Sequence, residues 1–325
     1  MNVQVDEEEL FLEAEGVRLP ARLTLPTSGS PRWGIVIIPG SMASDVDGNY
    51  PDTGSRPHLY ADLARQLAER GHAVLRYAKE GAQTGSVVVD EAASLAHPIF
   101  GKQQYIAAAA ARKLRELVPG LARLALAGHS EGSVHGMVVS QWPEVHPDAF
   151  ISLSGPGLRY FDLFFAWADS QPGDSVSLGP VKMLKTRYKK VFEVLRTGEE
   201  LPEEIATDPA YLNSFGRMGD DPRGKQYMRD YDAVDPTQEI AKIPCPVLLV
   251  QGGLDGSAVQ SSSAETLLAA RQAVDPAARL AYFPDLQHFY KKTTPDASPV
   301  ESFGISTESD PAVADAISEW LDGLK

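Results

Sequence analysis

The chain has 325 residues, a length that fits one large α/β domain carrying an insertion. Its 43% hydrophobic and 23% charged residues are typical of a globular protein and exclude a disordered chain. The net charge of −14 argues against a nucleic-acid partner, and no apolar run in the sequence is long enough to cross a membrane. The acidic start lacks the basic and apolar regions of a signal peptide, and Cys245, the one cysteine, cannot form an internal disulfide. We therefore expect a cytoplasmic protein without a membrane partner.

The first half of the chain alternates strand patterns with helix patterns. Residues Gln4–Leu12 and Val17–Thr24 alternate polar and apolar side chains around Glu15 and Gly16, which predicts an antiparallel hairpin. The continuous apolar run Trp33–Ile38 indicates a buried parallel strand. The further elements expected here are a helix through Leu59, Leu63 and Leu67, a strand over Ala73–Tyr77, a helix over about Lys102–Leu117, and strands over Leu124–Ala127 and Phe150–Leu153.

The region from about Pro156 to Ile240 interrupts this alternation. It contains helical patterns without a buried strand, so we predict a helical cap over 156–240, inserted into a core of 1–155 and 241–325. The core resumes with strands over Val247–Gln251 and Leu280–Phe283 and a closing helix over Ala312–Leu324, which predicts an α/β fold with a mostly parallel sheet. One helical face of the cap comprises Phe161, Phe164, Phe165 and Ala168, and another comprises Val181, Leu184, Tyr188, Val191, Phe192 and Leu195.

The aromatic residues Phe161, Phe164 and Phe165 have two interpretations. They could pack within the cap, as large apolar side chains usually do. Some of them could instead line an apolar pocket for an acyl chain, in which case they would bind substrate. Because adjacent positions of a helix diverge by about 100°, all three cannot face one pocket.

The segment Gly128-His129-Ser130-Glu131-Gly132 follows an apolar strand and leads into a helical stretch over Ser133–Gln141. Glycine at both flanking positions allows a sharp turn that projects the Ser130 hydroxyl above the sheet as a nucleophile. The alternative is a simple strand–helix turn in which Ser130 only caps the helix.

A serine nucleophile needs a base that is itself oriented by an acid. In this arrangement the acid and the base follow later strands, in the chain order serine, acid, histidine. Asp255 follows Val247–Gln251 through a glycine-rich loop, although an aspartate there could also be an ordinary turn residue. His288 follows Leu280–Phe283 and is the predicted base. His129 lies within the turn itself, where we expect its side chain to point away from the nucleophile's face.

Ester cleavage also needs two backbone N–H donors for the oxyanion. Glu131, directly after the nucleophile, offers one. The loop after Trp33–Ile38 offers the second from Ser41, or from Met42 if the register differs by one, and Gly40 permits close approach. The alternative is that the loop after Trp33–Ile38 is an ordinary turn without a role in binding the oxyanion. No metal-ligand spacing or nucleotide-binding motif occurs in the sequence, so we expect no metal and no cofactor.

Four segments of the chain match motifs that occur together in one family. They are Pro39–Gly48 (P-G-S-G-x-x-D-x-D-G in the family), Leu75–Gly81 (L-R-Y-D-K-R-G), the turn around Ser130 (G-H-S-E-G), and Pro246–Asp255 (P-V-L-x-x-x-G-x-x-D). With them the chain resembles the α/β-hydrolase superfamily, and more narrowly the serine esterases of its acyl-esterase and dienelactone-hydrolase-like branch. Met42, Ala78 and Glu80 depart from the motifs, replacing Gly, Asp and Arg.

The resemblance implies the α/β-hydrolase fold and hydrolysis of a small-molecule carboxylic ester, with Ser130, Asp255 and His288 as catalytic triad. Our interpretation is a serine hydrolase that works through an acyl-enzyme intermediate. A thioesterase, a lactonase or a small peptidase could use the same residues, and a catalytically silent binding protein could keep the same fold. The sequence leaves open the acyl and alcohol groups, the oligomeric state, and whether the segment from Tyr290 to Asp310 folds over the site.

Overall fold

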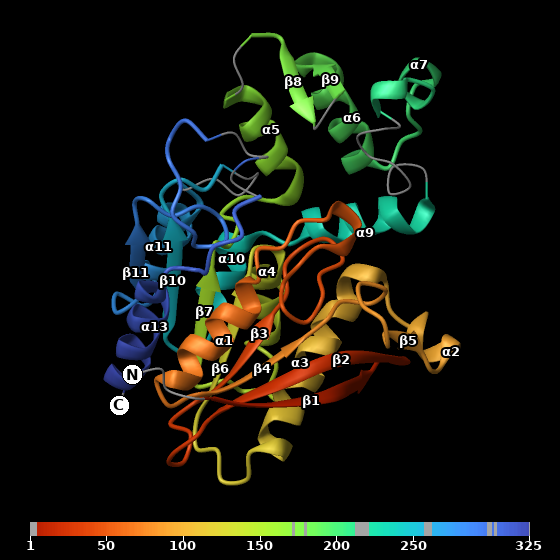
Figure 1. Ribbon diagram of the computed structural model, residues 1–325. Coiled ribbons are helices and arrows are strands. Elements are labelled where there is room, and N and C mark those ends of the chain that lie inside the picture. The colour runs from red at the N-terminus through yellow and green to blue at the C-terminus, as the bar shows by residue number, and fades with distance from the viewer. Residues whose placement is uncertain are drawn as a thin grey trace. The chain divides into compact units, whose positions relative to one another are not determined.

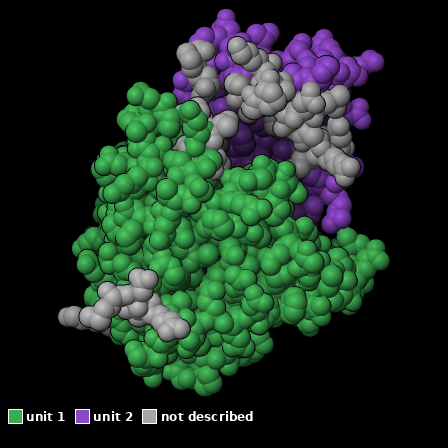
Figure 2. Space-filling model, viewed as in Figure 1, with its two compact units in different colours: residues 1–96, 103–157, 236–325 green, residues 97–102, 158–235 purple. Residues whose placement is uncertain are grey.

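The computed structural model describes residues 5–170, 173–178, 181–211, 221–256, 262–297, 301 and 304–324. The chain divides into two units, which Figure 2 shows in different colours. The larger unit consists of residues 1–96, 103–157 and 236–325, and the second unit of residues 97–102 and 158–235. None of the helices that the structure describes has both the length and the apolar character needed to span a bilayer.

A mixed sheet is the centre of the larger unit, with the strand order β1-β2-β4-β3-β6-β7-β10-β11 (Figure 1). The predicted hairpin is confirmed: β1 (Val5–Ala14) pairs antiparallel with β2 (Val17–Pro26), and β2 pairs antiparallel with β4 (Ala73–Tyr77) and with the short β5 (Val87–Val88). The remaining pairs are parallel, as predicted. From β4 they continue in the order β3 (Gly34–Ile38), β6 (Leu124–His129), β7 (Ala149–Leu153), β10 (Val247–Gly252) and β11 (Arg279–Phe283), each strand pairing with the next.

Helices cover both faces of this sheet. Val36 and Ile38 of β3 pack in a cluster with α3 (Ile99–Leu117), α4 (Glu131–Val139) and α11 (Ser262–Gln272). Ile35 and Ile37 lie in a second cluster, with α1 (Leu59–Glu69) and α13 (Pro311–Gly323). Successive side chains of a strand point to opposite faces, so a strand buried on both faces needs a continuous apolar sequence. The larger unit therefore has three layers, helices–sheet–helices.

The second unit is built around an aromatic cluster that includes Phe161, Tyr188 and Phe192. One prediction for this region is wrong. Val181 and Leu184 were expected on a helical face with Tyr188, but they lie in a strand that pairs antiparallel with its neighbour, and the helix starts only at Lys185. Short apolar runs do not distinguish helix from strand by periodicity alone. The elements are α5 (Tyr160–Ser170), β8 (Ser175–Leu178), β9 (Val181–Leu184), α6 (Lys185–Thr197), α7 (Glu203–Ala206) and α9 (Pro222–Ala233).

The described part of the larger unit also contains three short helices. The helix α10 (Pro236–Lys242), which begins within the predicted 156–240 insertion, contacts α4 and α11 and belongs to the larger unit. The others are η1 (Pro51–Thr53), in the loop after β3, and α2 (Glu91–Ser94), whose first turn is capped by the Asp90 side chain.

Candidate active site

Ser130 lies between β6 and α4 in a strained backbone conformation. Its φ of 53° and ψ of −123° form a combination that residues with a side chain rarely adopt. The adjacent glycines explain why the turn can form, because a Cβ at Gly128 would overlap the carbonyl group of Gly132, and one at Gly132 would overlap the carbonyl oxygen of Ile38. The Ser130 N–H donates to the carbonyl of Leu153 at 2.8 Å. This is the strand–turn–helix geometry that the G-x-S-x-G pattern predicts.

His288, which follows β11, and Asp255, which follows β10, form a buried pair. The Nδ1 atom of His288 lies 2.8 Å from Oδ2 of Asp255, and the amide of Gln251 donates to the same oxygen at 3.1 Å. A carboxylate only accepts hydrogen bonds, so the proton of the neutral imidazole is on Nδ1. The lone pair is then on Nε2, the state that a general base requires. Asp255 and His288 were predicted from the sequence as acid and base, whereas Gln251, which donates to the carboxylate, was not among the predicted residues.

His129 packs against His288, whereas from the sequence its side chain was expected to point away from the nucleophile's face. Their ring centroids are 4.7 Å apart, and Nε2 of His129 lies 3.2 Å from the backbone oxygen of His288. Burial, with His288 nearby, lowers the pKa of His129 to about 3, so the ring is neutral at neutral pH. A carbonyl oxygen only accepts, so Nε2 carries the proton and Nδ1 is an acceptor.

The direction of each hydrogen bond follows from this tautomer. The Tyr60 hydroxyl lies 3.3 Å from Nδ1 of His129 and donates to it. The hydroxyl oxygen accepts the N–H of Gly40 at 2.9 Å. One continuous chain therefore leads from the loop after β3, through Tyr60 and His129, to the backbone of His288. A sequence motif does not show this chain, because its members are far apart along the sequence.

The loop after β3 passes directly beside the turn at Ser130. A Cβ at Gly40 would lie 3.2 Å from Cβ of Ser130 and 3.1 Å from the backbone oxygen of His129, so any side chain here would be crowded and glycine favours this close approach. Ser41 and Met42 come next, and both are exposed. Met42 has a φ of 67°, in the left-handed region that favours the glycine of the family motif. Glu131 is the first residue of α4, where helix N–H groups have no partner within the helix.

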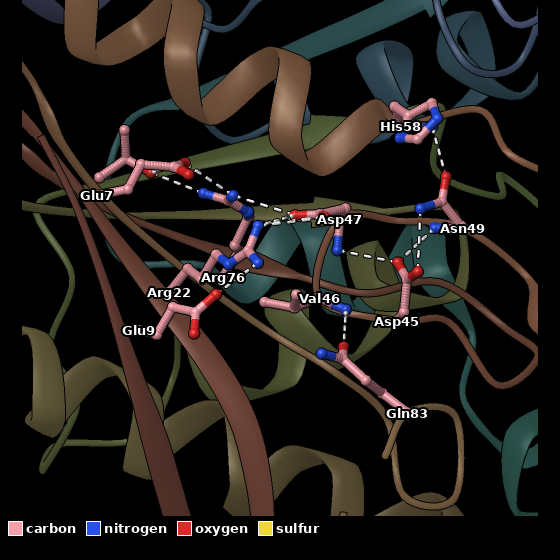
Figure 3. Close-up of polar contacts among 11 residues, drawn as sticks. Glu7, Glu9, Arg22, Asp45, Val46, Asp47, Asn49, His58, Arg76 and Gln83 are labelled. Atoms are coloured by element: carbon pink, nitrogen blue, oxygen red, sulfur yellow. Dashed lines mark hydrogen bonds and ion pairs between the residues drawn. The ribbon is translucent and has the colours of Figure 1, made fainter. Parts of the chain in front are cut away.

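Two aspartates hold this loop in shape (Figure 3). The carboxylate of Asp45 accepts the N–H groups of Asp47 and Asn49 at 2.9 and 2.8 Å. The carboxylate of Asp47 pairs with Arg76 at 3.1 Å and with Arg22 at 3.2 Å. Arg76 is a buried residue of β4, so the loop is tied to the neighbouring strand. The two aspartates of the family motif thus have a structural explanation, which is to fix the loop that carries Ser41.

Phe161, Phe164 and Phe165 lie around Phe192 within the second unit, with ring centroids 5.3, 4.9 and 5.9 Å from it. Phe161 is fully buried, whereas Phe164 and Phe165 are partly buried. This arrangement agrees with the core-packing interpretation for Phe161. A contact between these residues and substrate stays a prediction.

The described part of the segment from Tyr290 to Asp310 is anchored on α1. The Asp62 carboxylate accepts the N–H of Ser309 at 2.8 Å and lies 3.5 Å from Nζ of Lys291. Gln66 donates to the Glu308 carboxylate at 2.8 Å. Residues 298–300 and 302–303 lie outside the described residues. Whether this segment folds over the candidate site therefore stays open.

No family model and no curated protein matches this chain at the level of sequence. Among solved structures, the chain is similar to the Est1E protein of Butyrivibrio proteoclasticus, in a structure with ferulic acid bound. The TM-score is 0.56 at 17% identity, covering 96% of this chain and 97% of that chain. The chain adopts the α/β-hydrolase fold.

Other proteins share this α/β-hydrolase fold with the chain. The esterase Pf2001 of Pyrococcus furiosus has a TM-score of 0.53 at 15% identity, covering 87% of this chain and 84% of that one. A dienelactone hydrolase of Anabaena variabilis has a TM-score of 0.51 at 14% identity and covers 98% of both chains. The fold that the resemblance implies is therefore confirmed. At these identities the similarity concerns the fold alone.

Proposed function

We propose that this protein is a serine hydrolase that cleaves carboxylic esters with Ser130 as its nucleophile. The observation that carries the proposal is the hydrogen bond between His288 Nδ1 and Asp255 Oδ2, 2.8 Å long. Asp255 follows β10 and His288 follows β11, in the same sheet whose β6 leads directly into Ser130. All three strands run parallel, so their carboxyl ends lie at one edge of the sheet. The α/β-hydrolase fold supports this reading, since its catalytic residues occupy these strand ends in this chain order.

The proposed reaction has two stages. His288 takes the hydroxyl proton of Ser130 through Nε2, and Oγ attacks the ester carbonyl carbon. The tetrahedral intermediate collapses, the C–O bond to the alcohol breaks, and the alcohol leaves with the proton from His288. Water then attacks the acyl-enzyme while His288 takes its proton. The bond between the acyl carbon and Oγ of Ser130 breaks, His288 returns the proton to Oγ, and the acid leaves. Asp255 keeps the imidazole in the required tautomer and stabilises the imidazolium that forms.

The negative oxygen of each tetrahedral intermediate needs preorganised donors. We assign these to the backbone N–H of Glu131 and that of Ser41, with Met42 as the neighbouring alternative. The position of Gly40 beside Ser130 supports this assignment, because it brings the following peptide groups to the nucleophile. The N–H of Gly40 itself already donates to the hydroxyl of Tyr60.

A hydrolysis panel tests the proposal. It comprises p-nitrophenyl esters from acetyl to palmitoyl, methyl ferulate, acyl thioesters and aminoacyl amides, each with wild type and Ser130→Ala. We expect ester turnover by wild type and its loss in the variant. Wild type inactive on every ester, or Ser130→Ala as active as wild type, would refute the proposal. Faster turnover of thioesters or amides would replace the ester by the corresponding substrate class on the same residues.

A further inference from the structure

One lysine connects the two segments that carry the proposed oxyanion donors. Lys79, just after β4, places its Nζ 2.8 Å from the carbonyl oxygen of Gly40 and 3.1 Å from Oε1 of Glu131. Both side chains are shielded from solvent, that of Lys79 being 11% exposed and that of Glu131 1% exposed. The sheet order explains this meeting. Because β3 lies between β4 and β6 and all three are parallel, the segments that follow them converge at one edge.

Gly40 is held at both of its peptide groups. Its N–H donates to the Tyr60 hydroxyl at 2.9 Å, and its carbonyl accepts from Lys79. The two contacts together restrict φ and ψ of a residue that has no side chain to restrict them. The N–H of Ser41 belongs to the same planar trans peptide as the Gly40 carbonyl and points in the opposite direction. A contact that fixes the carbonyl therefore also fixes the direction of the Ser41 N–H.

Glu131, which directly follows Ser130, has a buried carboxylate. This carboxylate belongs to the residue whose N–H is the other proposed donor, and it also contacts Nε2 of His135 at 3.0 Å. Burial lowers the pKa of His135, so this histidine is neutral at neutral pH and donates without adding charge. Among the contacts described around Glu131, the balancing positive charge comes from Lys79.

We propose that Lys79 is the positioning residue of the oxyanion hole. Its ammonium group orients the Ser41 peptide through the Gly40 carbonyl and offsets the charge of the Glu131 carboxylate, so that both N–H groups face the developing oxyanion. This inference rests on the proposed function of Ser130, Ser41 and Glu131. Lys79 acts through these groups and forms no bond with substrate.

The test compares Lys79→Met with Lys79→Arg, and uses Lys113→Met as the matched control. Lys113 pairs with Glu116 within α3 at 3.5 Å, so its loss removes an ammonium group from an ion pair that includes none of the proposed site residues. Each variant is assayed for kcat and KM on an ester that wild type hydrolyses. Each is also assayed for inhibition by a trifluoromethyl ketone, which forms a charged tetrahedral adduct on a serine nucleophile.

We expect Lys79→Met to lower kcat on the order of 100-fold, the size of the loss of one oxyanion donor, with little change in KM. Affinity for the ketone should fall in proportion to kcat/KM. Lys79→Arg should recover part of kcat because it keeps a cationic donor, and Lys113→Met should match wild type. A folded Lys79→Met variant with wild-type kcat and wild-type ketone affinity would overturn the inference.

Lys79→Met leaves a buried carboxylate without its cation, which could prevent folding. The double variant Lys79→Met/Glu131→Gln removes that charge and is compared with Glu131→Gln alone. We expect its kcat to be lower by at least about 10-fold, because the Gly40 contact is still lost. Equal kcat in the two would overturn the inference. If wild type hydrolyses no ester, the proposed function fails instead, and an active wild type with an inactive Ser130→Ala variant separates the two outcomes.

Discussion

His129 donates from Nε2 to the backbone carbonyl of His288 across 3.2 Å. Because His129 directly precedes Ser130, this bond joins the turn that carries the proposed nucleophile to the loop that carries the proposed base. On its other side the ring accepts from Tyr60, whose oxygen accepts from Gly40. Buried contacts therefore set the spacing of three parts of the site: the loop after β3, the turn after β6 and the loop after β11.

Removing the Tyr60 hydroxyl tests this chain. We expect Tyr60→Phe to lower the free energy of unfolding by about 1–3 kcal/mol, because the N–H of Gly40 and Nδ1 of His129 both lose their partner. We also expect a lower kcat, since the loop beside Ser130 is no longer fixed. Urea unfolding and ester turnover measure the two effects. Tyr105→Phe, at an exposed position, is the control, and equal behaviour of the two variants would contradict the role of Tyr60.

Replacing Ser130 should separate activity from stability. We expect Ser130→Ala to lower turnover by on the order of 10⁴–10⁶ while the fold is kept. Ser130→Gly should be inactive yet raise the free energy of unfolding by about 1 kcal/mol, because glycine adopts a φ of 53° and a ψ of −123° without strain. The control is Ser140→Gly, at an ordinary helical φ of −63°, which should lower stability. Activity of Ser130→Ala within about tenfold of wild type would rule out the nucleophile assignment.

Replacing the acid and replacing the base should lower kcat by different factors. Asp255→Asn keeps the geometry but its amide favours the wrong imidazole tautomer, so we expect kcat to fall on the order of 10⁴. His288→Ala removes the base altogether and should cost at least as much. Steady-state kinetics of both variants on one ester make the comparison. A structure of the enzyme with His288 beyond about 6 Å from Oγ of Ser130 would contradict the triad, since no hydrogen bond spans that distance.

The aromatic residues of α5 are predicted to set the acyl-chain preference. We expect Phe161→Ala mainly to destabilise the protein, by about 3–5 kcal/mol, because this side chain is fully buried. Phe164→Ala or Phe165→Ala should change the ratio of kcat/KM between a short and a long ester by an amount equivalent to about 1–3 kcal/mol. If all three variants keep the wild-type ratio, these residues only pack within the second unit and the acyl pocket lies elsewhere.

The protein should become less stable as the pH is lowered, because His72 is buried in its neutral form. Burial, together with Arg32 and Arg70, lowers the pKa of His72 to about 4, and Asp322 offsets part of the shift. Below about pH 6.5 the unfolded chain binds a proton that the folded protein does not bind until about pH 4. The contribution of His72 to stability is therefore fully present above about pH 6.5 and is lost as the pH falls toward 4.

Urea unfolding at pH 7 and pH 5 measures this contribution. We expect the loss of stability between the two pH values to be smaller in His72→Gln than in wild type, by about 1–2 kcal/mol. His146→Asn is the control, because this histidine is exposed and asparagine tolerates its φ of 41°. An unchanged pH dependence in His72→Gln would show that His72 titrates alike in both states.

The parts of the fold that follow from local sequence were predictable. Strands β3, β6 and β10 are buried on both faces and therefore have continuous apolar sequences, and the glycines around Ser130 are required by backbone contacts within a few residues. The hairpin of β8 and β9 was missed because its four-residue strands are too short for periodicity to identify.

The residues that support the candidate site were missed for a different reason. Tyr60, Lys79 and His129 meet at Gly40 only because the sheet places β4, β3 and β6 side by side and α1 against one of its faces. Their roles depend on tertiary contacts between distant segments, and no spacing in the sequence encodes these. Lys79 does lie within the motif Leu75–Gly81, so the motif marked the segment without indicating its contact with Gly40.

In the proposed mechanism Ser130 forms a covalent bond with the acyl group of an ester. The most direct measurement is mass spectrometry of the protein after reaction with a fluorophosphonate, which phosphonylates an activated serine with loss of fluoride. We predict one added phosphonyl group on wild type, located by peptide mapping at Ser130, and none on Ser130→Ala. No label on folded wild type, or a label of equal extent on Ser130→Ala, would contradict the assignment of Ser130 as nucleophile.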